Sequence, residues 1–274
     1  MLAYNLEPNI FSLSLLRAFE EAAAEAGKHD YPIHLKMDTG MHRVGFMEED
    51  LPELITALRG CTHLRVVSIF SHLAGADEQA LDSFTHGQLE RFERMSSQVM
   101  ASLSYRPMRH ILNSAGQERF PQWQYDMVRL GIGLHGLSCC GNSELRPVAS
   151  LKTFVAQIKE LGEGDTVGYG CRGKIPVKKR IATIPVGYAD GYSRRLGNGV
   201  GKVSINGQLA PTIGNICMDT CMLDITGLSV QEGDAVTLFG DSPTIEELAA
   251  WLGTIPYEVL SDISPRIPRT YYTE

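Results

Sequence analysis

Residues 33–40 read Ile-His-Leu-Lys-Met-Asp-Thr-Gly, and this stretch decides the fold class of the chain. Apolar and polar residues alternate over 33–37, which is typical of a short β-strand. The Asp-Thr-Gly that follows is a turn signal. Just upstream, apolar residues recur at helical spacing over 11–26, and Gly27 is a natural helix end. The order helix, strand, turn is therefore predicted within the first 40 residues.

The same order repeats further along the chain. The spacing of apolar residues predicts helices over 51–58 and 80–103, and strands over 64–70, 109–112 and 127–133. Strands separated by helices pair in parallel, because the connection has to cross over the sheet. This part of the chain is therefore predicted to be an α/β sheet or barrel.

Beyond about Cys140 the long helices give way to β-rich sequence. Strands are expected over 151–158, 177–186, 202–205, 213–225 and 235–239, and Asn206-Gly207 is a two-residue hairpin signal. A single short helix is expected over 244–252, capped by Thr244. The chain is thus predicted to hold two domains, residues 1–140 and residues 141–274.

Composition and charge exclude several classes of function. Of the 274 residues, 43% are hydrophobic and 21% charged, as in ordinary globular proteins. The net charge of -7 offers no basic field for nucleic acid or an anionic membrane, and no apolar run approaches the ~18 residues of a membrane span. The six cysteines have neither disulfide nor zinc spacing, so we expect free thiols, no metal site and a cytoplasmic protein.

Polar side chains stand at or just past the carboxyl ends of predicted strands. They are Lys36, His72, Asn113-Ser114 and Arg129. A parallel barrel places its chemistry at these ends. Each residue alone is also explained as a hydrogen-bonded structural group, but four equivalent positions favour a functional site.

Two tyrosines of the β-rich half lie beside glycines. They are Tyr169 in Val167-Gly-Tyr-Gly170 and Tyr188 in Val186-Gly-Tyr-Ala189. Glycine lets the backbone turn sharply and leaves the phenol projecting from a fixed point. An ordinary turn at a strand end explains each tyrosine equally well.

Eight segments, in the same order, resemble the alanine racemase family. They are LKMDTGMHRVG (35–45), SIFSHLAGAD (68–77), HILNSAG (110–116), MVRLGIGLHGL (127–137), VGYG (167–170), TIPVGYADGYSRRL (183–196), IGNICMDTCMLDI (213–225) and SPRIPRTYY (264–272). The resemblance implies a (β/α)8 TIM-type barrel, incomplete in this chain, followed by a C-terminal mostly-β domain. It also implies pyridoxal 5'-phosphate as cofactor and the interconversion of L- and D-alanine, which supplies peptidoglycan precursors.

The resemblance implies three catalytic positions. Arg129 matches the partner of the cofactor ring nitrogen. A guanidinium stays protonated, so it donates a hydrogen bond and leaves that nitrogen without a proton of its own. Racemisation needs proton transfer on both faces of the substrate carbon, and the family uses a lysine on one face and a tyrosine, matching Tyr169, on the other. His72 matches the residue that assists this tyrosine.

The remaining matches concern binding. Arg43 and the backbone N–H of Met218 match the groups that hold the substrate carboxylate, and Tyr188 matches a tyrosine at the active-site entrance. Lys36 matches a lysine that is carbamylated and positions Arg43. The phosphate cradle matches Ser114 with Gly131 and Ile132, supported by Asn113. Since the residues matching Tyr169, Tyr188 and Met218 come from the partner subunit, the resemblance implies a homodimer with shared active sites.

The chain departs from the family pattern at two places. The Schiff-base lysine of the family lies in a VKANAYGHG-like segment, and none of the lysines here has that context. A barrel ending near Leu137 is also about half of the usual ~250 residues. We therefore expect this segment to lie upstream of Met1 and the chain alone to be inactive. Pro265 stands where many relatives carry a tyrosine that contacts the phosphate, and proline has no side-chain donor.

Two other functions remain open at the level of sequence. One is a non-catalytic binding or assembly module that keeps the fold without the chemistry. The other is a racemase of broader amino-acid range, which would share every residue named above.

Overall fold

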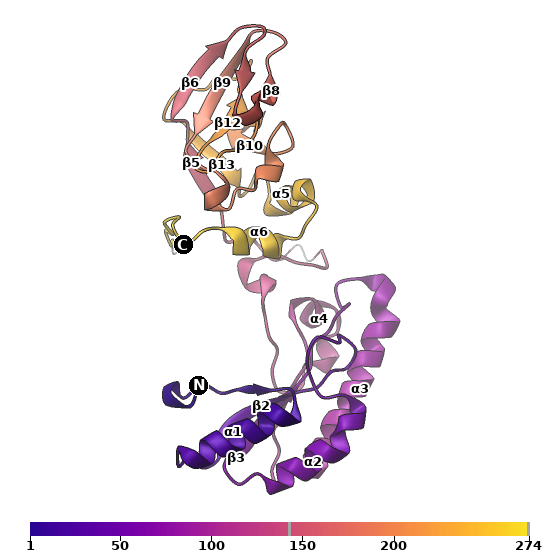
Figure 1. Cartoon of the computed structure of the whole chain (residues 1–274). Helices are drawn as coiled ribbons and strands as arrows, with labels where there is room; N and C mark the ends of the chain where they lie inside the picture. The colour runs from indigo at the N-terminus through magenta and orange to yellow at the C-terminus, as the bar shows by residue number, and fades with distance from the viewer. Residues whose placement is uncertain (142–143, 273–274) are drawn as a thin grey trace. The chain divides into compact units, whose positions relative to one another are not determined.

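The computed structural model describes residues 1–141 and 144–272. The chain divides into two compact units, Met1–Arg146 and Pro147–Glu274, and each is described here by itself (Figure 1). The predicted domain boundary after residue 140 lies a few residues before this division. None of the helices in the described ranges is long and apolar enough to cross a membrane.

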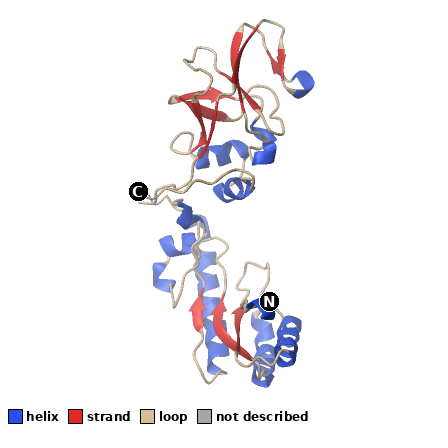
Figure 2. Cartoon of the chain, turned by 90° about the vertical axis from the view of Figure 1, so that its left-hand side faces the viewer, coloured by secondary structure: helices blue, strands red, loops and turns tan. Residues whose placement is uncertain are grey.

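The first unit, called the barrel unit below, is an α/β structure, as predicted. Its four parallel strands lie in the order β1-β2-β3-β4, and the helices run alongside them (Figures 1 and 2). The elements are β1 (Asn9–Ile10), α1 (Leu13–Glu25), β2 (Tyr31–Lys36), α2 (Leu51–Gly60), β3 (Leu64–Phe70), α3 (Asp82–Ala101), β4 (Met108–His110) and α4 (Ser114–Arg119).

Strand alternation decides which side chains reach the site. In β2, Ile33 and Leu35 are fully buried in the apolar core that also contains helix residues such as Leu16 and Phe92. The intervening His34 and Lys36 therefore point to the other face, because successive residues of a strand alternate. The parallel register pairs His34 with Ser68, and Phe70 with both Lys36 and His110. Polar side chains of three neighbouring strands, with Phe70 among them, thus lie on this face.

The strand predicted over 127–133 is wrong. Residues 127–130 are irregular, and Ile132–His135 form a 3-10 turn. The chain does run beside β4 and the residues after it, since the Asp126 amide donates to the Arg109 carbonyl at 3.1 Å and the Arg129 amide to the Leu112 carbonyl at 3.0 Å. However, the amides of Gly131 and Gly133 donate to Ser114 Oγ, so these donors are not available to a strand ladder.

The second unit, called the β unit below, is mostly antiparallel, as predicted. Its sheets have the strand orders β11-β10-β13-β5, β12-β9-β6 and β7-β8, and α5 and α6 lie at one end of the unit (Figure 1). The elements are β5 (Leu151–Phe154), β6 (Gln157–Leu161), β7 (Thr166–Val167), β8 (Gly173–Lys174), β9 (Lys179–Ile184), β10 (Lys202–Ile205), β11 (Gln208–Pro211), β12 (Cys221–Asp224), β13 (Ala235–Phe239), α5 (Ile245–Leu252) and α6 (Pro256–Asp262).

Local signals in this unit are confirmed where they are strongest. Asn206 and Gly207 join β10 to β11 with φ of 51° and 76°, as a type I′ hairpin requires. Thr244 caps α5, its hydroxyl accepting from the Glu247 amide.

Three expectations for this unit are wrong. The single strand expected over 151–158 is two strands, β5 and β6, which belong to different sheets. The single strand expected over 213–225 is interrupted, because Gly214 has a φ of 73° and the Cys217 amide closes a turn onto the Thr220 carbonyl. Only β12 remains extended there. A second helix, α6, follows α5 and begins at Pro256, a residue whose fixed φ suits the first helical position.

Candidate active site

The barrel unit gathers its predicted site residues around Arg129. This guanidinium donates to the carbonyls of Ser71 and Ile111 and to His110 Nδ1, and lies 3.4 Å from His72 Nδ1. It also lies over the Phe70 ring, 5.2 Å from its centroid. All of these bonds use the two terminal nitrogens, so within the described residues Arg129 Nε is left as an N–H donor without a partner.

A chain of hydrogen bonds that begins at His110 holds the Arg129 guanidinium in this orientation. His110 Nε2 lies 3.1 Å from Ser68 Oγ, which lies 2.6 Å from His34 Nδ1, and His34 Nε2 lies 2.8 Å from Glu7. If Arg129 donates to His110 Nδ1, one consistent direction runs along the chain, with both imidazoles neutral. This chain, which runs from His110 through Ser68 and His34 to Glu7, therefore orients the Arg129 guanidinium.

The site is strongly cationic in a chain of net negative charge. Burial, followed by the Arg129 and Arg43 cations, lowers the pKa of Lys36 to about 8, although Asp38 opposes them. Burial and the cations Arg129, Arg43 and Lys36 lower the pKa of His72 to about 4. Arg43 is exposed and has no side-chain hydrogen bond within the described residues. Such a site favours anionic ligands.

His110 gives a pH-dependent prediction. Burial and then Arg129 lower its pKa to about 4, from the ordinary histidine value of 6.5. Between these pH values the unfolded chain binds a proton that the folded unit does not, so stability falls as the pH drops from 6.5 towards 4. His110→Gln removes this titrating group. We therefore expect the free energy of unfolding to fall less steeply as the pH drops over that range, by a slope equivalent to up to one bound proton.

Urea unfolding of the barrel unit, followed by Trp123 fluorescence in a Trp251→Phe background, measures this slope. His86→Gln on the exposed side of α3 is the control and should leave the slope as in the parent. An NMR titration midpoint of His110 at or above 6.5 would contradict the prediction.

Ser114 organises the second part of the site. Its Oγ accepts from the amides of Gly131 at 2.9 Å and Gly133 at 3.2 Å. Asn113 holds it in place by capping α4 through the Gly116 amide and donating to the Leu73 carbonyl. A Cβ on Gly131 would meet nothing closer than 4.0 Å from the residue's surroundings, so the space over this turn is open. Ile132, between the glycines, presents its backbone there.

In the β unit, Tyr169 stands on a turn between two glycines of positive φ, Gly168 at 73° and Gly170 at 68°. The Asn215 side chain donates to the Tyr169 carbonyl at 2.9 Å and accepts from Asn198. The phenol itself is 73% exposed. The backbone is thus fixed while the side chain projects, as the flanking glycines predicted.

Tyr188 and Met218 are brought together by their backbones. The Tyr188 amide donates to the Cys217 carbonyl and the Ala189 amide to the Met218 carbonyl, both at 3.0 Å. This approach requires Gly187, because a Cβ there would lie 2.3 Å from the oxygens of both Cys217 and Met218.

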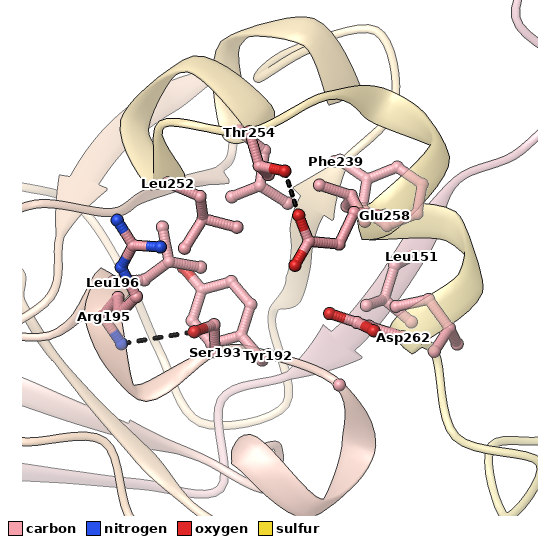
Figure 3. A pocket seen from close by; sticks show the side chains of 14 residues that line it. Leu151, Tyr192, Ser193, Arg195, Leu196, Phe239, Leu252, Thr254, Glu258 and Asp262 are labelled. Carbon is pink, nitrogen blue, oxygen red and sulfur yellow. Dashed lines mark hydrogen bonds between the residues drawn. The ribbon is translucent and has the colours of Figure 1, made fainter. Parts of the chain in front are cut away.

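An open groove of about 610 Å³ contains two of the three β-unit residues. Its lining includes Tyr169, Met218, Asp219 and Lys159. A smaller cavity of about 90 Å³ lies beside α5 and α6, lined by residues such as Tyr192 and Leu252 (Figure 3). It contains none of the predicted site residues, so the groove is the better candidate for substrate contact.

Sequence reasoning missed His110 and Asn215. His110 ends β4, so its position at a strand end was a usable signal. Asn215 acts on Tyr169 across a long sequence separation, which no local pattern shows.

The fold and the site define an enzyme of the class that joins a cofactor-binding α/β barrel to a β domain. Residues 1–139 match the family described as "Alanine racemase, N-terminal domain", and residues 148–271 match "Alanine racemase, C-terminal domain". The chain belongs to the alanine racemase family.

Individual relatives agree with this assignment. Alanine racemase 1 of Clostridium acetobutylicum is 39% identical over 283 residues, covering 99% of this chain and 72% of that protein. The alanine racemase structure from Streptomyces coelicolor has a TM-score of 0.90 at 33% identity, over 98% of this chain and 73% of its own. The Bartonella henselae alanine racemase structure, described with covalently bound pyridoxal phosphate, has a TM-score of 0.87 at 30% identity, over 98% and 74%.

Proposed function

We propose that this chain contributes to the racemisation of alanine and binds pyridoxal 5'-phosphate in its barrel unit. The observation that carries the proposal is Arg129, a partly buried guanidinium whose terminal nitrogens are fixed and whose Nε–H has no partner among the described residues. A free N–H donor of this kind fits the ring nitrogen of the cofactor, which accepts a hydrogen bond.

The residues around Ser114 fit the other end of the cofactor. Ser114 Oγ accepts from the Gly131 and Gly133 amides at the start of α4, so its own hydroxyl hydrogen, together with the Ile132 amide and the open space over Gly131, would receive the phosphate. Pro265 has no side-chain donor for the phosphate, so we propose that residues of the barrel unit bind it. Pyridoxal phosphate supplies an electron sink for the substrate α-carbon.

The remaining groups of the proposed reaction would come from both units. Tyr169 would transfer the proton on one face of the α-carbon. Arg43 and the Met218 amide would bind the substrate carboxylate, and Tyr188 would border the entrance. His72 stays neutral at physiological pH because of its lowered pKa, so it can accept a hydrogen bond from Arg129. A homodimer with shared sites follows from the resemblance, and sedimentation of the purified chain as a monomer would refute it for this chain.

Cofactor titration tests the proposal directly. Calorimetry with pyridoxal phosphate should show stoichiometric binding, and pyridoxal, which lacks the phosphate, should bind about tenfold more weakly or worse. Arg129→Lys keeps the charge but loses the Nε geometry and should weaken both ligands. Arg59→Lys, on the exposed end of α2, is the matched control. Equal affinities for pyridoxal and its phosphate would rule out the proposed cradle.

Lys36 is proposed to be carbamylated. Only a neutral amine reacts with CO2, and the pKa of about 8 leaves an appreciable neutral fraction near neutral pH. The product is an anion, which would replace the repulsion between Lys36 and Arg43 by attraction. A carbamate ¹³C resonance should appear with labelled bicarbonate and disappear in Lys36→Ala. A signal that survives this substitution would place the carbamate elsewhere.

A non-catalytic binding module is the second candidate function. It is favoured by one observation, the absence of the family's lysine context from these 274 residues. Stoichiometric cofactor binding without turnover is the result that this candidate predicts.

A further inference from the structure

We propose that Arg266 is a positioning residue for the substrate groups of the β unit. Its guanidinium ties the loop of Tyr188 to the turn of Met218 and neutralises Asp219 beside the Met218 amide. The inference rests on the proposed function, which gives Tyr188 and Met218 their roles.

Arg266 binds two carboxylates at once. Its Nε donates to Asp190 Oδ1 and its Nη2 to Asp219 Oδ1, both at 2.7 Å. The Asp190 side chain is buried, whereas that of Asp219 is largely exposed. A guanidinium presents several donors in a rigid plane, so it holds both partners in one fixed arrangement, which an ammonium group cannot do.

Asp190 transmits this contact to Tyr188. Its second carboxylate oxygen accepts from the Gly187 amide at 2.8 Å, and its own amide donates to the Gly187 carbonyl at 3.0 Å. The turn that carries Tyr188 is therefore closed by Asp190. Arg266 fixes the carboxylate that closes it.

Asp219 transmits the second contact to Met218, its neighbour in sequence. The turn of residues 217–220 already receives the amides of Tyr188 and Ala189 on its Cys217 and Met218 carbonyls. The bond from Arg266 to Asp219 holds the same turn from another point. Two backbone bonds and one guanidinium thus join the loop and the turn.

Charge gives Arg266 a second effect. Asp219 lines the same groove as Met218. A substrate carboxylate on the Met218 amide would be repelled by an unpaired Asp219, since like charges at a few ångströms interact unfavourably. The guanidinium cancels this repulsion without itself lining the groove.

The backbone that carries Arg266 is anchored to the same loop. It follows α6, whose Glu258 and Asp262 point into the small cavity beside Tyr192 (Figure 3). The Asp262 carbonyl lies so close to Gly191 that a Cβ there would be 2.3 Å away, and the Ser264 amide donates to the Asp190 carbonyl. Arg266 therefore acts from a fixed segment.

Amide hydrogen exchange on the 274-residue chain tests the positioning. Arg266→Gln should speed exchange at the Tyr188 and Ala189 amides by about tenfold, the scale of a lost charge-assisted bond, and leave Leu223 in β12 unchanged. Arg180→Gln is the matched control, because the Arg180 guanidinium donates to the carbonyls of Leu228 and Val230, which belong to neither the Tyr188 loop nor the Met218 turn. Arg266→Lys should restore part of the protection.

An NMR titration with L-alanine, followed at the Met218 amide, tests the effect of charge. The parent chain should respond, Arg266→Gln should respond more weakly, and Arg266→Lys should recover most of the response because it keeps the charge. No response in the parent chain would count against the proposed role of Met218, not against the link between the two loops. Parent-like exchange at Tyr188 and Ala189 in Arg266→Gln would overturn the inference, whatever the titration shows.

Discussion

The purified 274-residue chain will not convert L-alanine into D-alanine, even with saturating pyridoxal phosphate. In the resemblance on which the function rests, one lysine both binds the cofactor covalently and transfers a proton, so a chain without it would lose the reaction instead of slowing it. The lysines of the chain are Lys28, Lys36, Lys152, Lys159, Lys174, Lys178, Lys179 and Lys202. Of these, Lys36 lies by the Arg129 site, and it is bonded to its neighbour's carbonyl at 2.8 Å.

Two measurements check this result. A coupled assay for D-alanine should stay at background, with the Clostridium acetobutylicum relative as positive control. Borohydride reduction with pyridoxal phosphate, followed by mass spectrometry, should give no stoichiometric label on any lysine. Because Lys36 has a lowered pKa, it is the position at which labelling is checked first, with Lys36→Ala as the matched variant. Turnover together with a stoichiometric label on one lysine would overturn the prediction.

The fold was predictable where the signal is local. The bounds of β3 and β10 agree with the sequence prediction, since alternation and the Asn206-Gly207 turn lie within a few residues. The strand expected over 127–133 does not form, because the Gly131 and Gly133 amides donate to the Ser114 hydroxyl, earlier in the chain, and not to a neighbouring strand. Non-local hydrogen bonds of this kind leave no periodic pattern in the sequence.

The candidate site residues could be predicted from strand ends and from motifs, but the hydrogen bonds between them could not. Lys36 ends β2 and His72 lies just past β3, and parallel strands bring their carboxyl ends together. Arg129 lies near them without a strand, because residues 127–130 are irregular. The bonds of Arg129 to His110, and of Arg266 to Asp190 and Asp219, join segments whose approach depends on tertiary packing. Their residues stand within quoted motifs, but the pairing is visible only in three dimensions.

Gly187→Ala should destabilise the β unit by about 3 kcal/mol, at the upper end of what one inserted methyl group costs in a packed region. The added Cβ would lie 2.3 Å from the carbonyl oxygens of Cys217 and Met218, and both of these atoms belong to backbone. A rotamer change cannot relieve such contacts, so one loop has to move. Movement breaks the bonds from the Tyr188 and Ala189 amides to these oxygens, and with them the relation of Tyr188 to Met218.

Urea unfolding followed by Trp251 fluorescence, in a Trp123→Phe background, isolates the β unit for this measurement. Gly162→Ala is the matched control in the same unit, because a Cβ at Gly162 meets only the end of the Asp165 side chain, at 3.8 Å. We expect its midpoint to stay near that of the parent, whereas Gly187→Ala shifts to markedly lower urea. Equal midpoints for the two variants would mean that the loop and the turn separate without cost. Tyr188 and Met218 would then not be held at a fixed distance, and the basis for assigning them to one substrate site would fall.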